Sequence, residues 1–151
     1  MKDTLKQIAE TQRTLKELCD DYSRDTADLR SHNNDRVEEL YQQILNFMAE
    51  KLQSYKQFYI HFTDLLHTVA SLYLKGEGWI RIRANDDWSH VFIGTCGDRS
   101  VSHKAVVLQW KELKESYLRS LEKQKEGYLK ASKDARQEQL DLQEQLDAFE
   151  L

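Results

Sequence analysis

The chain has 151 residues, of which 22 are Lys or Arg and 26 are Asp or Glu, so its formal net charge is −4. It contains 5 Gly and no Pro, a composition that excludes a loop-rich β-sandwich, a collagen-like repeat and a Pro-rich disordered chain. The length suits one domain and excludes a multidomain enzyme. We therefore expect a single elongated, mainly α-helical domain over residues 1–151.

The first predicted element is an N-terminal coiled-coil helix over residues 1–33. Between residues 2 and 30, seam positions recur at alternating steps of three and four, the a/d pattern of a coiled coil. The polar members Gln12 and Thr26 interrupt this seam, and polar seam residues set register at a cost in stability. A marginal helix that only a partner orders is the alternative. The apolar positions that we predict to form an oligomer interface are Leu5, Ile8, Leu15, Tyr22 and Leu29.

Residues 31–35 are the first break in this pattern. Ser31, His32, Asn33, Asn34 and Asp35 are all polar, and short polar side chains favour helix caps and turns. Asp35 and the Glu three residues later resemble a capping box, which indicates that a helix starts here. Because no Gly or Pro is present, the helix can equally continue without a break. The choice between a turn and one continuous helix stays open.

The second predicted helix covers residues 35–75. Apolar residues follow the three-and-four spacing from Val37 to Tyr73, and the apolar stripe widens after residue 55, so more than one neighbour must cover it. Gly76 and Gly78 end this helix. The positions that we predict to lie at a bundle or oligomer interface are Tyr55, Tyr59, Phe62, Leu66 and Val69, together with Trp110 from the following helix.

A β-hairpin is predicted over residues 78–97. Residues 79–84 alternate in period two, and residues 90–95 form a second β-branched and aromatic run. Asn85, Asp86 and Asp87 between the two runs are turn-forming residues. An isolated hairpin is marginally stable, so this one must pack on its own helices or pair with the hairpin of another subunit.

A last helix is predicted over residues 101–150, with Ser100 or Ser102 as its N-cap. Its length is comparable with that of the helix predicted over 35–75, so we expect the two to form an antiparallel coiled-coil hairpin or bundle with the β-hairpin inserted between them. The order helix, β-hairpin, helix resembles the prefoldin plan at the level of topology. This resemblance implies, as an alternative function, an ATP-independent chaperone subunit.

The predicted β-hairpin carries the candidate partner-binding residues. These are Trp79, Arg81, Arg83, Trp88 and His90, and Trp and Arg are enriched in binding hot spots. The same side chains can also form the solvated side of a sheet. We favour partner binding, because a coiled coil needs only a short turn to reverse its direction.

Catalytic and metal sites are not expected. His90, Cys96 and His103 lack the fourth ligand of a zinc pattern, and the chain has neither HExxH nor CxxC. No GxSxG motif or Gly-rich phosphate loop is present. We therefore predict no catalytic residues, no metal and no cofactor.

Charge and hydropathy limit the other partners. Residues 104–136 carry nine basic and five acidic residues and residues 137–151 carry five acidic and no basic ones, so no polybasic arm for nucleic acid exists. Glu residues interleave with the Lys residues of the last helix, which disfavours a membrane-binding face, although a membrane-surface-binding helical dimer stays an alternative. No signal-like or membrane-spanning run occurs, so we expect the cytoplasm. The predicted function is a non-enzymatic coiled-coil scaffold or adaptor that forms homodimers or higher homo-oligomers and binds protein partners.

Overall fold

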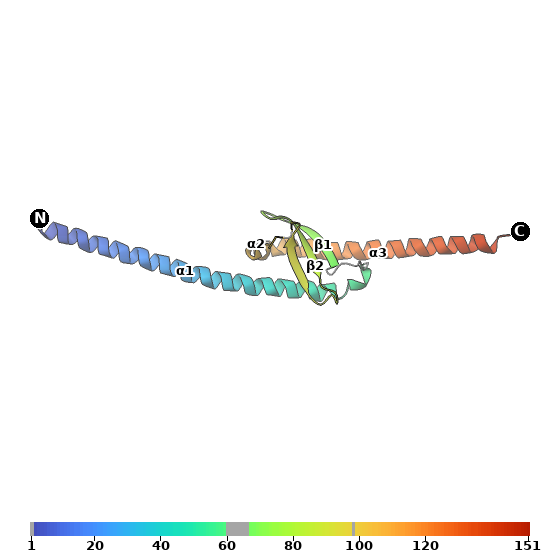
Figure 1. Ribbon diagram of the computed structural model, residues 1–151, viewed down its shortest axis with the longest axis horizontal. Coiled ribbons are helices and arrows are strands. Elements are labelled where there is room, and N and C mark those ends of the chain that lie inside the picture. Colours follow the sequence, from blue (N-terminus) through green and yellow to red (C-terminus); the bar gives the residue numbers. More distant parts are fainter. Residues whose placement is uncertain (1, 60–66, 98) are drawn as a thin grey trace. The chain divides into compact units, whose positions relative to one another are not determined.

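The computed structural model describes residues 2–59, 67–97 and 99–151. Along the chain lie the helix α1, a short 3-10 helix η1, three strands and two further helices (Figure 1). Their bounds are α1 Lys2–Leu52, η1 Lys56–Phe58, β1 His67–Leu74, β2 Gly78–Ala84, β3 Val91–Thr95, α2 His103–Leu108 and α3 Trp110–Asp147. The predicted mainly helical fold is therefore confirmed. Backbone contacts divide the chain into two compact units, Met1–Glu39 and Leu40–Leu151.

Helix α1 runs without a break through residues 31–35. Of the two alternatives that the sequence left open, the structure has the continuous helix, and the turn that Asp35 allowed is not formed. Every side chain from 31 to 35 is exposed, so water hydrates the polar groups of these residues while their backbone stays helical. Arg36 and Glu39 form an ion pair with an N–O distance of 3.1 Å one turn further on, a spacing that supports an exposed helix.

The second predicted helix, over residues 35–75, is wrong for the described residues beyond Leu52. Helix α1 ends at Leu52, and His67–Leu74 is strand β1. The Gln53 side chain donates through Nε2 to the carbonyl oxygen of Trp88 at 2.6 Å and to that of Ala49 at 3.3 Å. This contact ties the end of α1 to the β2–β3 connection, so tertiary structure ends the helix where the sequence has neither Gly nor Pro.

The strands form one antiparallel sheet in the order β1-β2-β3. Two of them, β2 and β3, correspond to the runs predicted as a hairpin, but the sheet has three strands where two were predicted. In the β1–β2 turn, Gly76 has φ 87° and Gly78 has φ 83°, backbone angles that L side chains rarely adopt. The glycines interpreted as a helix stop therefore shape a strand reversal.

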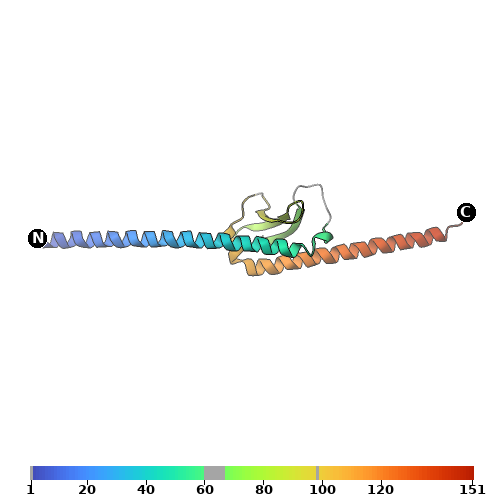
Figure 2. The same ribbon diagram turned by 90° about the horizontal axis from the view of Figure 1, so that it is seen from below.

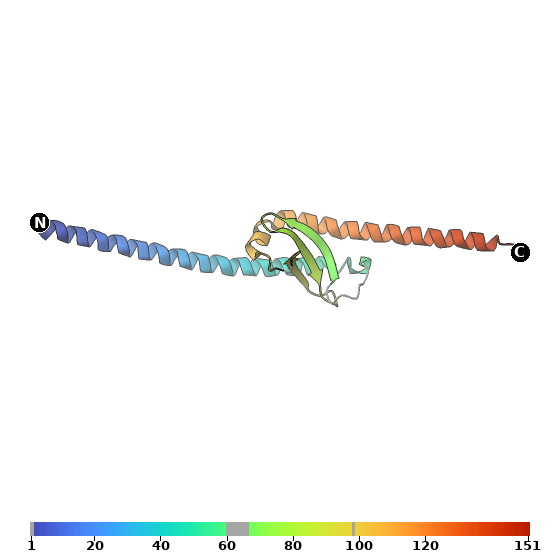
Figure 3. The same cartoon turned by 45° about the horizontal axis from the view of Figure 1, so that its top comes forward.

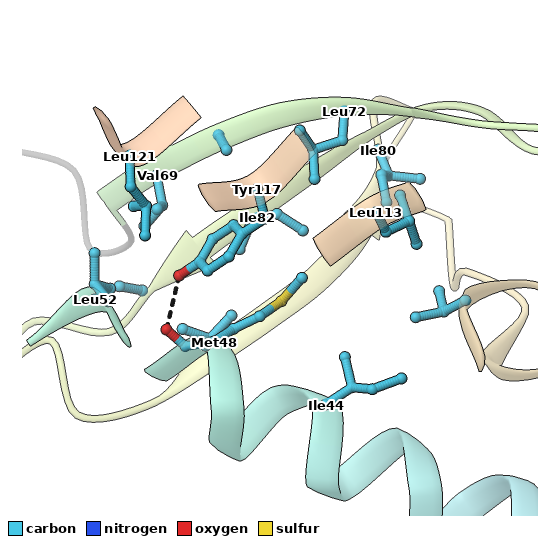
Figure 4. Close-up of a cluster of buried hydrophobic side chains, with 14 of the residues drawn as sticks. Ile44, Met48, Leu52, Val69, Leu72, Ile80, Ile82, Leu113, Tyr117 and Leu121 are labelled. Atoms are coloured by element: carbon cyan, nitrogen blue, oxygen red, sulfur yellow. Dashed lines mark hydrogen bonds between the residues drawn. The ribbon is translucent and has the colours of Figure 1, made fainter. Parts of the chain in front are cut away.

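One face of the sheet is buried against the helices. Side chains alternate along β1 and β2, with Leu72, Leu74, Ile80 and Ile82 at most 5% exposed. The last turns of α1 and the first turns of α3 cover this inner face (Figures 2 and 3). The helices supply Ile44, Met48, Leu52, Leu113, Tyr117 and Leu121, all buried in the same cluster (Figure 4). Tyr59 and Val69, predicted as interface residues, also lie in this core.

Helices α1 and α3 run in the same direction where they meet within Leu40–Leu151. The Phe47 and Trp110 rings lie edge to face with centroids 5.4 Å apart. Further along both helices, the Tyr117 hydroxyl donates to the Met48 carbonyl oxygen at 2.7 Å. Past the end of α1, Gln124 Nε2 donates to the Phe58 carbonyl oxygen at 2.8 Å. Along these three contacts the residue numbers rise together on the two segments, so α1 and α3 are parallel where they meet.

The predicted antiparallel hairpin of helices therefore needs correction, and so does the prefoldin-like order helix, β-hairpin, helix. Two strands between helices would return the chain once and leave the helices antiparallel. A third strand adds one more reversal of chain direction. The two helices then run parallel on one face of the sheet.

The helix predicted over 101–150 is divided at Gln109 into α2 and α3. Ser102 is its N-cap, as predicted for one of two serines, and its side chain accepts from the Ala105 N–H at 3.2 Å. Gln109 bonds the Lys75 backbone twice, its Oε1 accepting from the N–H and its Nε2 donating to the carbonyl, each at 3.0 Å. This double contact holds the break between the helices against the β1–β2 turn.

We predict that Tyr117→Phe lowers the free energy of unfolding by about 1 kcal/mol, the typical net value of one hydrogen bond. The substitution keeps the ring that fills the core and removes only the hydroxyl that bonds Met48. Chemical denaturation measures the difference. Tyr73→Phe is the matched control, since the Tyr73 side chain is 60% exposed, and should change stability by less than about 0.5 kcal/mol.

The same variant should change the response to alkaline pH. Burial raises the pKa of both Tyr117 and Tyr59 well above the ordinary value of a tyrosine. Their contribution to stability is complete below the unfolded-state pKa of about 10 and is lost as pH rises above it, because only the unfolded chain then ionises. Thermal unfolding between pH 9 and 11 should show a shallower decline for Tyr117→Phe than for the unchanged chain. Equal declines would contradict this role of Tyr117.

Candidate functional site

The outer face of the sheet, opposite the helices, carries exposed aromatic and arginine side chains. Cross-strand pairing sets Tyr73 beside Trp79, and Arg83 beside Phe92. Tyr73 is 60%, Trp79 58% and Phe92 49% exposed, while Arg81 and Arg83 are half-buried. We use the name outer face for these five residues: Tyr73, Trp79, Arg81, Arg83 and Phe92.

The aromatic side of the outer face is ordered by ring contact. The Tyr73 and Trp79 rings lie edge to face, with their centroids 5.8 Å apart and their planes at 72°. Aromatic pairs in this arrangement attract each other beyond the area they bury. The two rings therefore present a preformed apolar surface that loses little conformational freedom on binding.

A shallow hollow of about 280 Å³ lies at the other side of the outer face. Its lining includes the guanidinium-bearing residues Arg81, Arg83 and Arg99 and the ring of Phe92. Among the described residues that line it, none is Asp or Glu. The hollow therefore suits an acidic group, because guanidinium groups bind carboxylates through two parallel hydrogen bonds.

The structure brings three of the five predicted partner-binding residues together. Trp79, Arg81 and Arg83 share the outer face. Tyr73 and Phe92 belong to it as well and were missed by sequence reasoning, Tyr73 because it was assigned to a helix. A signal for Tyr73 was present in the sequence. Apolar residues alternate there with outward-facing ones, in the order Ala70, Ser71, Leu72, Tyr73 and Leu74.

Trp88, the fourth predicted residue, lies in the core instead. It is 5% exposed, and its ring stacks on His67 at 4.3 Å between centroids and contacts Tyr59 at 5.5 Å. Its φ of 63° is in the left-handed region, which non-glycine residues rarely adopt. That backbone turn directs the ring inward, and the residue is thus a structural element of the β2–β3 connection.

His90, the fifth predicted residue, lies in a polar network of the same connection. Its backbone N–H donates to Asn85 Oδ1 at 2.9 Å, and its Nδ1 lies 2.7 Å from Ser89 Oγ. Ser89 in turn donates to Asp87 through its backbone N–H and its hydroxyl. These hydrogen bonds lower the pKa of the Asp87 carboxyl. The network holds the loop that positions Trp88.

The predicted interface residues fall into separate groups. In the unit Met1–Glu39, the seam residues Leu5, Ile8, Leu15, Tyr22 and Leu29 are between 49% and 72% exposed. In the other unit, Tyr55 donates a short hydrogen bond to Glu122, which is the main reason that its pKa is raised. Trp110 is half-buried against Phe47. Phe62 and Leu66 lie outside the described residues.

Chemistry-bearing groups are dispersed over the described chain. Cys19 and Cys96 are both exposed free thiols, and His103 stacks on Tyr41 with ring centroids 3.7 Å apart. Within residues 2–59, 67–97 and 99–151, no three His, Cys, Asp or Glu side chains are grouped to hold a metal ion. In the same ranges, no helix combines the length and the apolar character needed to cross a membrane.

Comparison with known proteins gives no relative. The chain matches no protein-family model, no curated protein and no solved structure.

The two environments of Trp79 and Trp88 predict effects of very different size on the free energy of unfolding. Trp88→Ala should lower the free energy of unfolding by about 3–5 kcal/mol, the range for removing a large buried aromatic side chain. Trp79→Ala should lower it by no more than about 0.5–1.5 kcal/mol, the value of the lost ring pair with Tyr73, since the ring is largely in solvent. Chemical denaturation provides the comparison.

A second measurement keeps this assignment testable if Trp88→Ala does not fold. Acrylamide quenches accessible tryptophans, so Trp79→Phe should remove more of the quenchable fluorescence than Trp88→Phe does. Stronger protection of Trp79 than of Trp88 would contradict the assignment of the two sheet faces.

Proposed function

We propose that the chain is a non-enzymatic protein–protein interaction module, a scaffold or adaptor, that binds a partner protein through the outer face of its sheet and joins with copies of itself through α1. The observation that carries the proposal is the outer face, where three half-exposed aromatic rings and two half-buried arginines share one side of the sheet. Tyr, Trp and Arg are the residues most enriched in binding hot spots.

The site geometry favours recognition over catalysis. The outer face is broad and shallow, and the described residues that line its hollow carry guanidinium, aromatic, aliphatic and hydroxyl groups. None of these lining residues is a His, Cys, Asp or Glu that could act as a general base on the hydroxyls of Thr95 and Ser100. A flat face with aromatic anchors and a charged margin resembles the anatomy of protein interfaces. An acidic partner surface would complement Arg81 and Arg99.

Self-association is supported by the exposed seam of α1. Five large apolar side chains repeat along 25 residues of helix with coiled-coil spacing and lie exposed, and such a stripe becomes stable by pairing with another helix. A homodimer is the smallest assembly that covers it. The exposed thiols Cys19 and Cys96 suit a reducing compartment such as the cytoplasm.

Partner binding should depend on the outer face. The double variant Trp79→Ala, Arg81→Glu should lose at least about 2 kcal/mol of binding free energy, or about thirtyfold in affinity, for a partner that the unchanged chain captures. The matched control is Leu108→Ala, Lys104→Glu on α2, because Leu108 is 73% exposed and the charge change is the same. Pull-down followed by quantitative binding compares the three chains. Equal partner binding by the outer-face variant would exclude this face.

Self-association should depend on the seam. Light scattering on a sizing column should give a mass of a dimer or a higher oligomer of the 17.9 kDa chain, and Leu15→Glu, Tyr22→Glu should give the monomer, since two buried carboxylates oppose pairing. Gln7→Glu, Thr14→Glu adds the same charge on the opposite helix face and should leave the assembly intact. A monomer at all concentrations would contradict self-association.

A further inference from the structure

The seam of α1 has eight positions, which are Leu5, Ile8, Gln12, Leu15, Cys19, Tyr22, Thr26 and Leu29. They follow steps of three and four without interruption, and all are exposed. Because α1 is one continuous helix through this range, the eight side chains form a single stripe. With Leu5 at position a of the heptad, Gln12, Cys19 and Thr26 also occupy a, and the other four occupy d.

A parallel, in-register pair of seams sets each residue against its own copy. Gln12 then faces Gln12, where two side-chain amides can donate to and accept from each other. Thr26 faces Thr26, and the apolar layers of Leu5, Leu15 and Leu29 stay apolar. Polar and apolar layers are therefore kept apart along the whole seam, as required when a polar side chain is removed from water.

The antiparallel alternative mixes these layers. Full overlap of the two seams then pairs Leu5 with Leu29, which in turn places Gln12 against Tyr22 and Ile8 against Thr26. Each such layer buries a polar group against a larger, mostly apolar side chain. Since a buried polar group without a hydrogen-bond partner is destabilising, this alignment is the weaker one.

Charges beside the seam favour the same alignment. In a parallel pair, position g of one helix contacts position e of the next heptad in its partner, which sets Asp25 against Arg30 of the other copy, twice by symmetry. The antiparallel pair brings e positions together, so Lys16 approaches Lys16. The first arrangement attracts and the second repels.

From these layers and charges we infer that two copies of the chain pair in parallel and in register through residues 5–29. This inference rests on the self-association proposed above and adds its geometry. In such a pair, both chains leave the seam at the same end, so both outer faces follow from that end. A partner that offers two binding sites would then be held by both copies with an avidity that neither copy has alone.

Single-cysteine variants of the full chain test the geometry. In Cys96→Ala, the remaining Cys19 lies in the seam, and a parallel pair brings both thiols within the Cα separation that a disulfide allows. In Leu5→Cys, Cys19→Ala, Cys96→Ala, the parallel pair again sets the two cysteines together. An antiparallel pair separates them by 24 residues along the helix axis, or about 36 Å.

Both chains should form a disulfide-linked dimer on treatment with diamide, which takes up the two thiol hydrogens. Crosslinking should be at least about tenfold faster than in Thr14→Cys, Cys19→Ala, Cys96→Ala, whose cysteine lies on the opposite helix face, beyond disulfide reach of its copy. A dimer by light scattering that does not crosslink through Leu5→Cys would overturn the parallel alignment and leave self-association standing. A chain that is monomeric in both measurements would overturn both.

Discussion

The architecture of the unit Leu40–Leu151 depends on an odd number of strands between two helices. Three antiparallel strands turn the chain so that α3 starts beside the last turns of α1 and runs the same way, as the contacts Phe47–Trp110 and Met48–Tyr117 show. Both helices then cover one face of the sheet. The inner side chains of β1 and β2 are buried by this cover, and the hydroxyl of Tyr117 is satisfied by the backbone of α1 rather than by water.

The same constraint creates the surface that we propose as functional. A sheet covered on one side leaves its other face in solvent, and the alternation of side chains assigns Tyr73, Trp79 and Phe92 to that face. A two-stranded hairpin would be marginally stable on its own, whereas three strands fixed on two helices form a rigid platform. Strand β1 thus contributes both stability and the ring of Tyr73.

The sequence predicted elements well where one period dominates. Steps of three and four identified the helix over residues 2–30. Strict alternation identified the run that became β2, and β-branched and aromatic composition identified the run that became β3. It was wrong at residues 67–74, where Val69 and Tyr73 fit a helical stripe while Ala70, Leu72 and Leu74 fit a strand. Both patterns are present in those eight residues, and the pairing of β1 with β2 decides between them, a tertiary effect that local spacing does not contain.

The candidate site shows the same difference between what local sequence patterns predict and what tertiary contacts decide. Trp79, Arg81 and Arg83 alternate along one strand, a local pattern, and the structure places all three on the outer face. Trp88 was not separable from them by sequence, since its burial depends on a positive φ in a loop and on contacts with Tyr59 and His67. The continuity of α1 through residues 31–35 was also undecidable, because polar residues that favour a cap are equally compatible with an exposed helix.

The central claim is that residues 67–74 form a strand whose outer side chains adjoin those of β2. Nuclear Overhauser effects between backbone protons test it directly. The register, with Ser71 opposite Arg81 and Tyr73 opposite Trp79 as non-hydrogen-bonded pairs, predicts strong Hα–Hα effects within both pairs. Helical contacts between residues three apart within 67–74, with no effect between Tyr73 and Trp79, would contradict the three-stranded sheet and the outer face built on it.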